Sequence, residues 1–161
     1  MNRQILLLGG NQGNVIAACK KAVTLLSDSL GDPILQSAYY ESEPWGFEAS
    51  QNFINQVVEF HSTIEATELL TVTQSIEQQL GRQTKTGTHY ESRLIDIDIL
   101  FIDDLQIDLA QLKVPHPRLH ERKFTLLPLM DYWSNFMHPT FKKTITQLTH
   151  ECLDKGIVQR L

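Results

Sequence analysis

Apolar residues recur along this chain with two different periods, and the order in which the two periods alternate predicts the topology. Alternating or continuous apolar runs predict strands, whereas apolar residues three or four positions apart predict helices. Strands are expected at residues 4–8, 34–41, 53–61 and 93–101, and helices at residues 15–30 and 66–80. The order strand, helix, strand, strand, helix, strand is that of the split βαβ, or ferredoxin-like, arrangement. We therefore expect an α+β fold, an α/β sandwich in which both helices cover one face of an antiparallel sheet and leave the other face open.

Capping and turn residues predict where these elements end. Asn14 is suited to cap the first helix, which Gly31 ends, and Gly81 ends the second helix. The glycine-rich segment 9–13 follows a strand but lacks the spacing of the phosphate-binding motifs, so we interpret it as a tight turn. The other expected features are loops at 42–51 and 82–92, a hairpin that turns at 103–104 into a short strand near 105–109, a short helix broken near Pro128, and a helix over 145–153.

The strand over residues 93–101 carries two acidic residues among apolar ones. Because side chains alternate between the faces of a strand, Asp96 and Asp98 are expected on one face, about 7 Å apart. Leu94 and Leu100 are expected on that face as well, and Ile95, Ile97, Ile99 and Phe101 on the opposite face. Neighbouring carboxylates repel each other, and Mg²⁺, which prefers carboxylate oxygens, removes that repulsion. The open alternative is that both acids lie on a solvated sheet face without a metal.

Composition and charge exclude several classes of protein. With 161 residues, 42% hydrophobic and 20% charged, the chain is expected to form a single soluble domain over residues 1–161. The net charge of −5 and the lack of a basic block argue against a nucleic-acid partner. The two cysteines are too few for a disulfide framework, and the apolar runs are too short for a signal peptide or a membrane span. A cytoplasmic location is therefore expected.

Basic residues flank the acidic strand in the sequence. Arg82, Lys85 and Arg93 lie on or beside the loop that leads into the strand, and His116, Arg118, His120 and Arg122 lie in the segment after the hairpin. Guanidinium groups bind phosphate oxygens in pairs, so arginines near a metal site predict a polyphosphate-binding site. The alternative for each arginine is a solvated loop position. His116, which lies between two prolines, is either a rigid turn residue or a hydrogen-bond donor to phosphate.

An aromatic and an amide side chain, Phe53 and Asn55, share one face of the third strand. This pair suits a flat heteroaromatic ligand, because the ring can stack on the ligand and the amide can bind its edge. The alternative is an ordinary core phenylalanine beside a turn asparagine. Glu77 lies one position off the apolar stripe of the second helix, where it either supports the site or is purely structural.

Six segments in order extend this pattern over nearly the whole chain. They are Leu8-Gly-Gly-Asn11, Glu43-Pro-Trp-Gly-Phe47, Phe53-Ile-Asn55, Ile76-Glu-Gln-Gln-Leu-Gly-Arg82, Arg93-Leu-Ile-Asp-Ile-Asp98 and Val114-Pro-His-Pro-Arg-Leu-His-Glu-Arg122. Together they resemble the family of 6-hydroxymethyl-7,8-dihydropterin pyrophosphokinases, enzymes of folate synthesis. The resemblance implies a ferredoxin-like α/β fold. It also implies transfer of the terminal pyrophosphate of ATP to the hydroxymethyl group of the pterin, with release of AMP.

The resemblance further implies roles for particular residues. Asp96 and Asp98 would bind two Mg²⁺ ions and, with Arg82 and Arg93, would form the catalytic set. The pterin would be enclosed by Ser42, Pro44, Trp45, Gly46, Phe53, Asn55 and Phe124. ATP would contact Gln74, Glu77, Arg82, Tyr90, Arg93, Ile99, His116 and Arg122. We expect a monomer whose partners are these two small substrates.

The chain departs from the family pattern at two places. Tyr90-Glu91-Ser92 stands where Trp-Gly-Pro is common, and Gly10 stands where a serine is common. Roles for Lys85, Gln111 and Lys113 stay open. Because ATP must be protected from water, loops 42–52 and 82–93 are expected to close over bound substrates. Two rival hypotheses are a non-catalytic ligand-binding module and a magnesium-dependent nucleic-acid enzyme; the acidic net charge argues against the latter.

Overall fold

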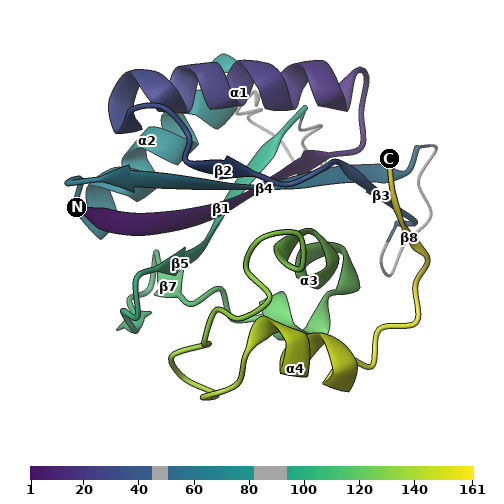
Figure 1. Cartoon of the computed structure of the whole chain (residues 1–161). Helices are drawn as coiled ribbons and strands as arrows, with labels where there is room; N and C mark the ends of the chain where they lie inside the picture. The colour runs from purple at the N-terminus through teal and green to yellow at the C-terminus, as the bar shows by residue number, and fades with distance from the viewer. Residues whose placement is uncertain (45–50, 82–93) are drawn as a thin grey trace.

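The computed structural model describes residues 1–44, 51–81 and 94–161, and one antiparallel sheet lies at its centre (Figure 1). The strands of this sheet are β1 (Asn2–Gly10), β2 (Leu35–Gln36), β3 (Tyr40–Ser42), β4 (Phe53–Ser62), β5 (Asp96–Ile102) and β8 (Val158–Arg160). Their spatial order is β5-β1-β4-β3-β8, and β2 also pairs with β4. This is the strand order of the split βαβ arrangement, extended at one edge by β8. The expected ferredoxin-like fold is therefore confirmed.

The two long helices, α1 (Val15–Leu30) and α2 (Ala66–Gln79), lie together on one face of the sheet (Figure 1). The side chain of Asn14 caps α1 by accepting a hydrogen bond from the Ala17 N–H at 3.1 Å. Apolar residues of both helices and of the facing strands form one buried cluster, which includes Leu6, Leu8, Leu26, Phe60, Leu69 and Ile97. The predicted helices and the face that they cover are thus confirmed.

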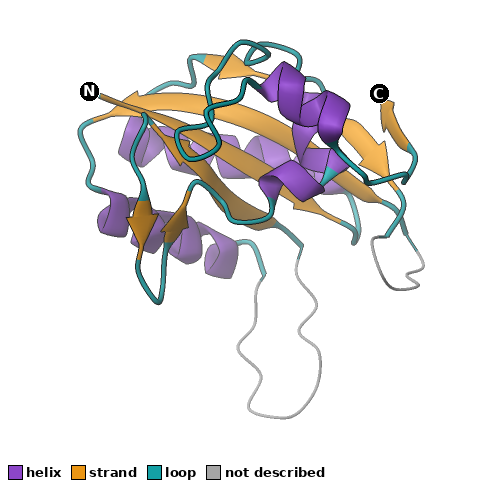
Figure 2. Ribbon diagram, turned by 90° about the horizontal axis from the view of Figure 1, so that it is seen from below, coloured by secondary structure: helices purple, strands orange, loops and turns teal. Residues whose placement is uncertain are grey.

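The second face of the sheet is not open along its whole length, so this part of the prediction is wrong. The helices α3 (Lys123–Leu129) and α4 (Ile145–Glu151) pack on it, preceded by the 3₁₀ turn η1 (Leu119–Glu121) (Figures 1 and 2). A second buried cluster joins them to the sheet and contains Ile5, Leu7, Val57, Leu126, Leu129 and Trp133. A sheet with apolar residues on both faces needs other elements packed against both of them. The C-terminal third of the chain packs against the second face.

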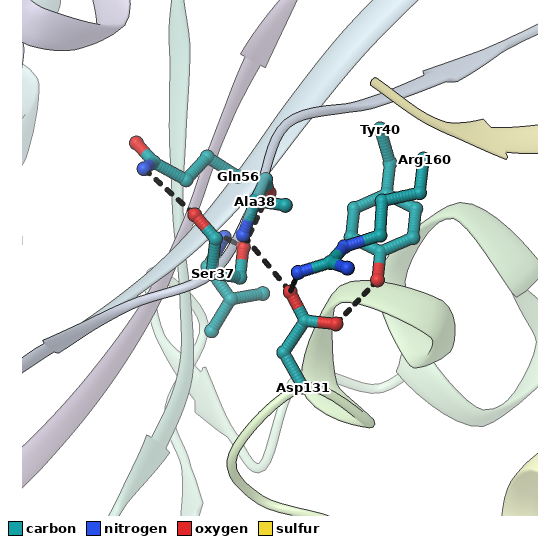
Figure 3. Close-up of polar contacts among 7 residues, drawn as sticks. Ser37, Ala38, Tyr40, Gln56, Asp131 and Arg160 are labelled. Carbon is teal, nitrogen blue, oxygen red and sulfur yellow. Dashed lines mark hydrogen bonds and ion pairs between the residues drawn. The ribbon is translucent and has the colours of Figure 1, made fainter.

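The strand expected at 34–41 is divided into β2 and β3 by a short irregular segment. Here the Ser37 hydroxyl accepts a hydrogen bond from the Val57 N–H at 2.9 Å, and the Ala38 N–H donates to the Asp131 carboxylate at 2.9 Å. Figure 3 shows Asp131 also contacting the Tyr40 hydroxyl. The strand is interrupted because the Ser37 and Asp131 side chains accept hydrogen bonds from backbone N–H groups at this point.

The unpredicted strand β8 is held at the same place. It pairs with β3, and Arg160 approaches Asp131 to 3.9 Å (Figure 3). The last residues of the chain therefore fasten the outer edge of the sheet to the layer of α3 and α4.

The acidic strand β5 forms the opposite edge of the sheet and contains a β-bulge. Its register with β1 shifts so that Ile5 lies opposite Phe101 and Leu6 lies opposite Ile99, which leaves Leu100 as the extra residue. An extra residue reverses the faces of those that follow it. Phe101 therefore lies in the second buried cluster rather than beside Ile99 as predicted.

The predicted hairpin turns at Asp103, whose φ is 47°. Its short strand β6 (Ile107–Asp108) pairs with β7 (Lys113–Val114) in a separate small sheet and not with β5.

The final helix ends at Glu151, two residues earlier than predicted. In the part of the chain described, no helix has both the length and the apolar character to cross a membrane.

Candidate active site

The candidate site lies where the ends of β5, β1 and β4 meet on the second face of the sheet. The strand register places Asp96 opposite Gly9, and Gly9 opposite Asn55. The next row on the same face places Asp98 opposite Leu7. Residues far apart in the sequence are thus brought into two adjacent rows by strand pairing.

A hollow of about 190 Å³ opens above these rows, between the strands and the start of α3. It is lined by Leu7, Gly9, Glu43, Phe53, Asn55, Asp96, Asp98, Arg122 and Phe124. Asp96 and Asp98 both line it and are both partly buried, so the prediction that the two acids share one face is confirmed. The cover over the rest of this face makes the site a recess rather than an open surface.

Gly9 provides the room in which the Asn55 amide lies. A Cβ atom at residue 9 would lie 1.9 Å from Asn55 Oδ1 and 2.9 Å from the backbone oxygen of Ile54. Gly10 is equally constrained, since its Cβ would lie 2.6 Å from the backbone oxygen of Leu94. Both glycines belong to β1, so the predicted tight turn over 9–13 is wrong at its first two residues. They are needed for close approach of neighbouring chain segments.

The Asn55 amide is buried and, within the described ranges, retains an unpaired hydrogen-bond donor. Its side chain is buried, and Nδ2 has no hydrogen-bond partner among the described residues. A buried donor without a partner is costly, so Nδ2 is available to an acceptor atom of a ligand in the recess. Phe53 and Phe124 line the same recess and supply aromatic surface. Of the other predicted pterin-binding residues, Ser42 is buried at the end of β3 and Pro44 is half-buried two residues later.

A second hollow of about 270 Å³ adjoins the first beyond β5. Leu70, Ile97, Asp98, Ile99, Ala110, Gln111, Leu112, Lys113, His116 and Pro117 line it. Asp98 therefore lines both hollows and lies at their junction. The Ile99 side chain belongs to the buried cluster under α1 and α2. Lys113, whose role was open, lines it and forms an ion pair with Asp108.

His116 is a neutral imidazole in this position. Burial first, then the charges of Arg122 and Arg118, lower the pKa of His116 to about 4. Nδ1 accepts a hydrogen bond from the Arg118 N–H at 3.2 Å, so the ring proton belongs on Nε2. The backbone of His116 is fixed as well, since its N–H donates to the carbonyl of Leu100 at 3.0 Å. His116 is thus presented as an uncharged hydrogen-bond donor beside the second hollow.

Arg122 brings positive charge to the first hollow. Its guanidinium carbon lies 5.6 Å from the ring centroid of Phe124, within the range of a cation–π contact. Burial lowers the pKa of Arg122, whereas the nearby Asp98 carboxylate raises it. An arginine remains charged in any such setting, so a fixed cation faces the acidic pair across the recess.

The two remaining described residues with an expected role in ATP binding lie on α2. Gln74 is exposed and lines neither hollow. Glu77 is buried, lines neither hollow, and accepts a hydrogen bond from the Ile97 N–H at 3.1 Å. It therefore contacts the backbone of the acidic strand between the two aspartates.

Several predictions concern residues outside the described parts of the chain. These are the expected roles of Trp45, Gly46, Arg82, Lys85, Tyr90 and Arg93, and the closure of the two loops. Sequence reasoning gave no role to Leu7 and Gly9 in the lining of the first hollow, whereas Glu43, which also lines it, lies within the 42–46 segment whose backbone was expected to enclose the pterin. Leu7 and Gly9 carry no chemical signal of their own and are found only from the strand register.

The donor set fits a hard divalent cation. No group of three or more His, Cys, Asp or Glu side chains is arranged around a common point within the described ranges. Asp96 and Asp98 thus offer two carboxylates and leave the other coordination positions to water or phosphate oxygens. This is the arrangement that Mg²⁺ favours when it is bound with a phosphorylated substrate.

Fold and site together define an α/β enzyme of the phosphotransfer class. It has an acidic pair that suits magnesium, a recess that suits a flat ring, and an adjoining hollow lined in part by Lys113 and His116. Residues 5–134 match the family model of 7,8-dihydro-6-hydroxymethylpterin-pyrophosphokinase. The chain belongs to this family and is therefore a pyrophosphokinase, a transferase.

Relatives and solved structures support the assignment. A 2-amino-4-hydroxy-6-hydroxymethyldihydropteridine pyrophosphokinase of Porphyromonas gingivalis is 38% identical over 136 residues, 83% of this chain and 92% of that protein. The protein of the same name from Aquifex aeolicus is 37% identical over 144 residues, covering 89% and 88%. A crystal structure of Plasmodium falciparum HPPK-DHPS with pteroate superposes with a TM-score of 0.77 at 18% identity. That match covers 93% of this chain but 44% of the longer one, and it concerns the fold alone.

Proposed function

We propose that this protein transfers the pyrophosphoryl group of ATP to the hydroxymethyl group of 6-hydroxymethyl-7,8-dihydropterin, giving the pterin diphosphate and AMP in tetrahydrofolate biosynthesis. The observation that carries the assignment of the site is the position of Asp98, which lines both hollows. A substrate in each hollow would place its reacting end beside this residue. The transferred phosphates would then lie over Asp96 and Asp98.

The recess over β1 and β4 is the proposed pterin site. Phe53 and Phe124 would pack against the faces of the bicyclic ring, and Asn55 would bind its edge through the unpartnered Nδ2. Glu43 lies at the same recess and is exposed, so it is available at the entrance. Pro44 and the backbone around Ser42 would close the outer side.

The hollow beyond β5 is the proposed nucleotide site. β5 is an edge strand, so backbone groups of Ile99 that point away from β1 are available to the adenine edge. The apolar side chains of Leu70 and Leu112 line the same hollow and suit a flat base. His116 would donate from Nε2 to a phosphate oxygen. Arg122 would bind phosphate from the other side, together with Arg82 and Arg93 as the family pattern implies.

Two Mg²⁺ ions held by Asp96 and Asp98 would neutralise the phosphate charge when bound. The protein itself has little covalent work. The hydroxymethyl oxygen of the pterin attacks the β-phosphorus of ATP, the bond from that phosphorus to the oxygen bridging to the α-phosphorus breaks, and AMP leaves on that oxygen as the hydroxyl proton is lost. Positioning of the two substrates and fixed positive charge from Arg122 are the contributions of the described residues.

The direct test is to incubate the protein with Mg-ATP and the hydroxymethyl dihydropterin and to measure AMP and pterin diphosphate. We expect both products in equal amounts, and loss of both in Asp96→Ala with the circular dichroism spectrum retained. Asp104→Ala, which removes an exposed carboxylate outside both hollows, is the matched control and should be active. Full turnover by Asp96→Ala would exclude the metal role. Tight Mg-ATP binding without AMP formation would favour a non-catalytic binding module.

We further propose that the enzyme acts as a cytoplasmic monomer. The residues that line the two proposed substrate sites lie within a single chain. The two cysteines, Cys19 and Cys152, are both free thiols, as expected in a reducing compartment. Sedimentation of the purified protein with and without substrates would test the monomer.

A further inference from the structure

We propose that Glu77 is a positioning residue that fixes the edge of β5, and through it the orientation of the Asp96 and Asp98 carboxylates toward their metal ions. This inference rests on the proposed function for the metal-binding role of the two aspartates. It assigns Glu77 a role different from nucleotide contact, because its side chain is buried and lines neither hollow.

The strand β5 lies at the edge of the sheet. β5 pairs with β1 on one side only, and its other side has no strand partner in the described structure. Backbone groups on that side must find other partners or remain unsatisfied. The Ile97 N–H points to this side and donates to Glu77 Oε2 at 3.1 Å in a buried hydrogen bond. Ile97 lies between the two aspartates, so the bond fixes the peptide group that follows Asp96.

A second contact on the same edge completes the arrangement. The Leu100 carbonyl accepts a hydrogen bond from the His116 N–H at 3.0 Å. Asp98 therefore lies between two anchored backbone groups, the N–H of Ile97 on one side and the carbonyl of Leu100 on the other. On the opposite edge, Asp98 is paired with Leu7 of β1. The segment that carries both carboxylates is thus held from both sides.

A carboxylate is well suited to this task. A carboxylate oxygen is a strong acceptor for an N–H, and α2 packs beside β5 and so brings Glu77 to it. Groups that hold metal ligands in position typically change metal affinity by about 10- to 100-fold when they are removed. Loosening Ile97 would let the two aspartate side chains turn away from their shared orientation, because alternate side chains follow the backbone of the strand.

The test compares Glu77→Ala, which removes the acceptor, with Glu77→Gln, which retains an acceptor oxygen. Glu68→Gln makes the same chemical change at an exposed position of the same helix and serves as the control. Three quantities are measured for each variant: amide hydrogen exchange of Ile97, affinity for Mg²⁺ in the presence of a non-hydrolysable ATP analogue by calorimetry, and kcat at several Mg²⁺ concentrations.

We expect Glu77→Ala to speed the exchange of the Ile97 amide and to weaken Mg²⁺ binding by about 10- to 100-fold. Its kcat should recover in part at high Mg²⁺. Glu77→Gln should keep Ile97 protected and restore Mg²⁺ affinity to within about threefold, and Glu68→Gln should resemble the wild type. If Glu77→Ala does not fold, the Mg²⁺ affinity and the Ile97 exchange of Glu77→Gln decide whether the proposal holds. Loss of Mg²⁺ affinity in Glu77→Gln with Ile97 still protected would overturn the proposal, as would unchanged affinity in Glu77→Ala.

The proposed function fails by a different result. If Asp96→Ala keeps wild-type Mg²⁺ affinity, the metal site itself is wrong, whatever Glu77 does. If Asp96→Ala loses that affinity but Glu77→Ala does not, the aspartates bind metal without help from Glu77.

Discussion

Adding one methyl group at Gly9 should selectively weaken the pterin site. In Gly9→Ala the new Cβ would lie 1.9 Å from Asn55 Oδ1 and 2.8 Å from Asn55 Cγ, whereas ordinary contacts begin near 3.4 Å. The Asn55 amide must therefore retreat by about 1.5 Å, the difference between 3.4 Å and 1.9 Å. A hydrogen bond of ordinary length, about 2.9 Å, is lost after such a shift.

The size of the effect follows from what Asn55 would lose. A buried polar group left without its partner costs about 1–3 kcal/mol. At about 1.4 kcal/mol for each factor of ten, pterin affinity should fall by about 5- to 150-fold. Nucleotide affinity should change by less than about twofold, because Gly9 does not line the second hollow.

Calorimetric titration of the pterin into protein saturated with a non-hydrolysable ATP analogue measures this loss. Gly156→Ala is the control, since a Cβ at residue 156 meets only the carboxylate end of Asp154, at 3.1 Å. The clash with the amide disappears in an Asn55→Ala background, whereas the approach to the Ile54 backbone oxygen at 2.9 Å remains, so Gly9→Ala should cost less there than in the wild type. Equal losses in the two backgrounds, or unchanged pterin affinity in Gly9→Ala, would refute the reasoning.

Three further perturbations test the charges around the site and the core. Arg122→Met should lower kcat/KM by at least about 100-fold, because removing one fixed donor that stabilises charge in a transition state costs about 2.7–4 kcal/mol. Circular dichroism should show the fold retained. Trp133→Phe removes the indole N–H that donates to the buried Glu59 carboxylate at 2.5 Å, so urea unfolding should show a loss of about 1–3 kcal/mol. Burial raises the pKa of Glu59, but hydrogen bonds from Trp133, His61 and Arg3 outweigh burial and hold the pKa below its ordinary value of 4.5. The stability that Glu59 contributes is therefore present above pH 4.5 and is lost as the pH falls below it. Trp133→Phe should accordingly lose less folding stability than the wild type on acidification. Burial lowers the pKa values of His116 and His138 to about 4, so their ¹³C-edited NMR signals should not titrate between pH 8 and pH 5.5. The free energy of unfolding should decline as the pH falls from 6.5 toward 4, because the unfolded chain then binds protons that the folded rings do not. Titration of either ring near pH 6.5 would contradict the buried, neutral assignment.

Much of the architecture was predictable because local periodicity reflects which side of an element is buried. The order of strand and helix patterns predicted the split βαβ topology, and Asn14 and Gly31 predicted the ends of α1. The alternation of Asp96 and Asp98 with isoleucines correctly predicted that the two acids share a face. Each of these features depends on neighbours within a few residues in the sequence.

Predictions failed where a contact between distant parts of the chain overrode the local pattern. Phe101 changes face because a bulge forms against β1, and the 34–41 strand divides because Asp131 and Ser37 take backbone partners. The glycine-rich end of β1 is strand rather than turn, since it pairs with both β4 and β5.

The amino-acid sequence by itself determined the class of fold, the family and the chemical character of the site, because motif spacing and side-chain alternation are local properties. Only the tertiary structure decided that Gly9 makes room for Asn55, that Asp98 lies between two hollows, and that Glu77 binds the backbone of β5. The physical reason is that each of these depends on the register of strands and on the seating of α2 and α3 against the sheet. Those contacts join residues 20 or more positions apart, and no short stretch of sequence encodes them.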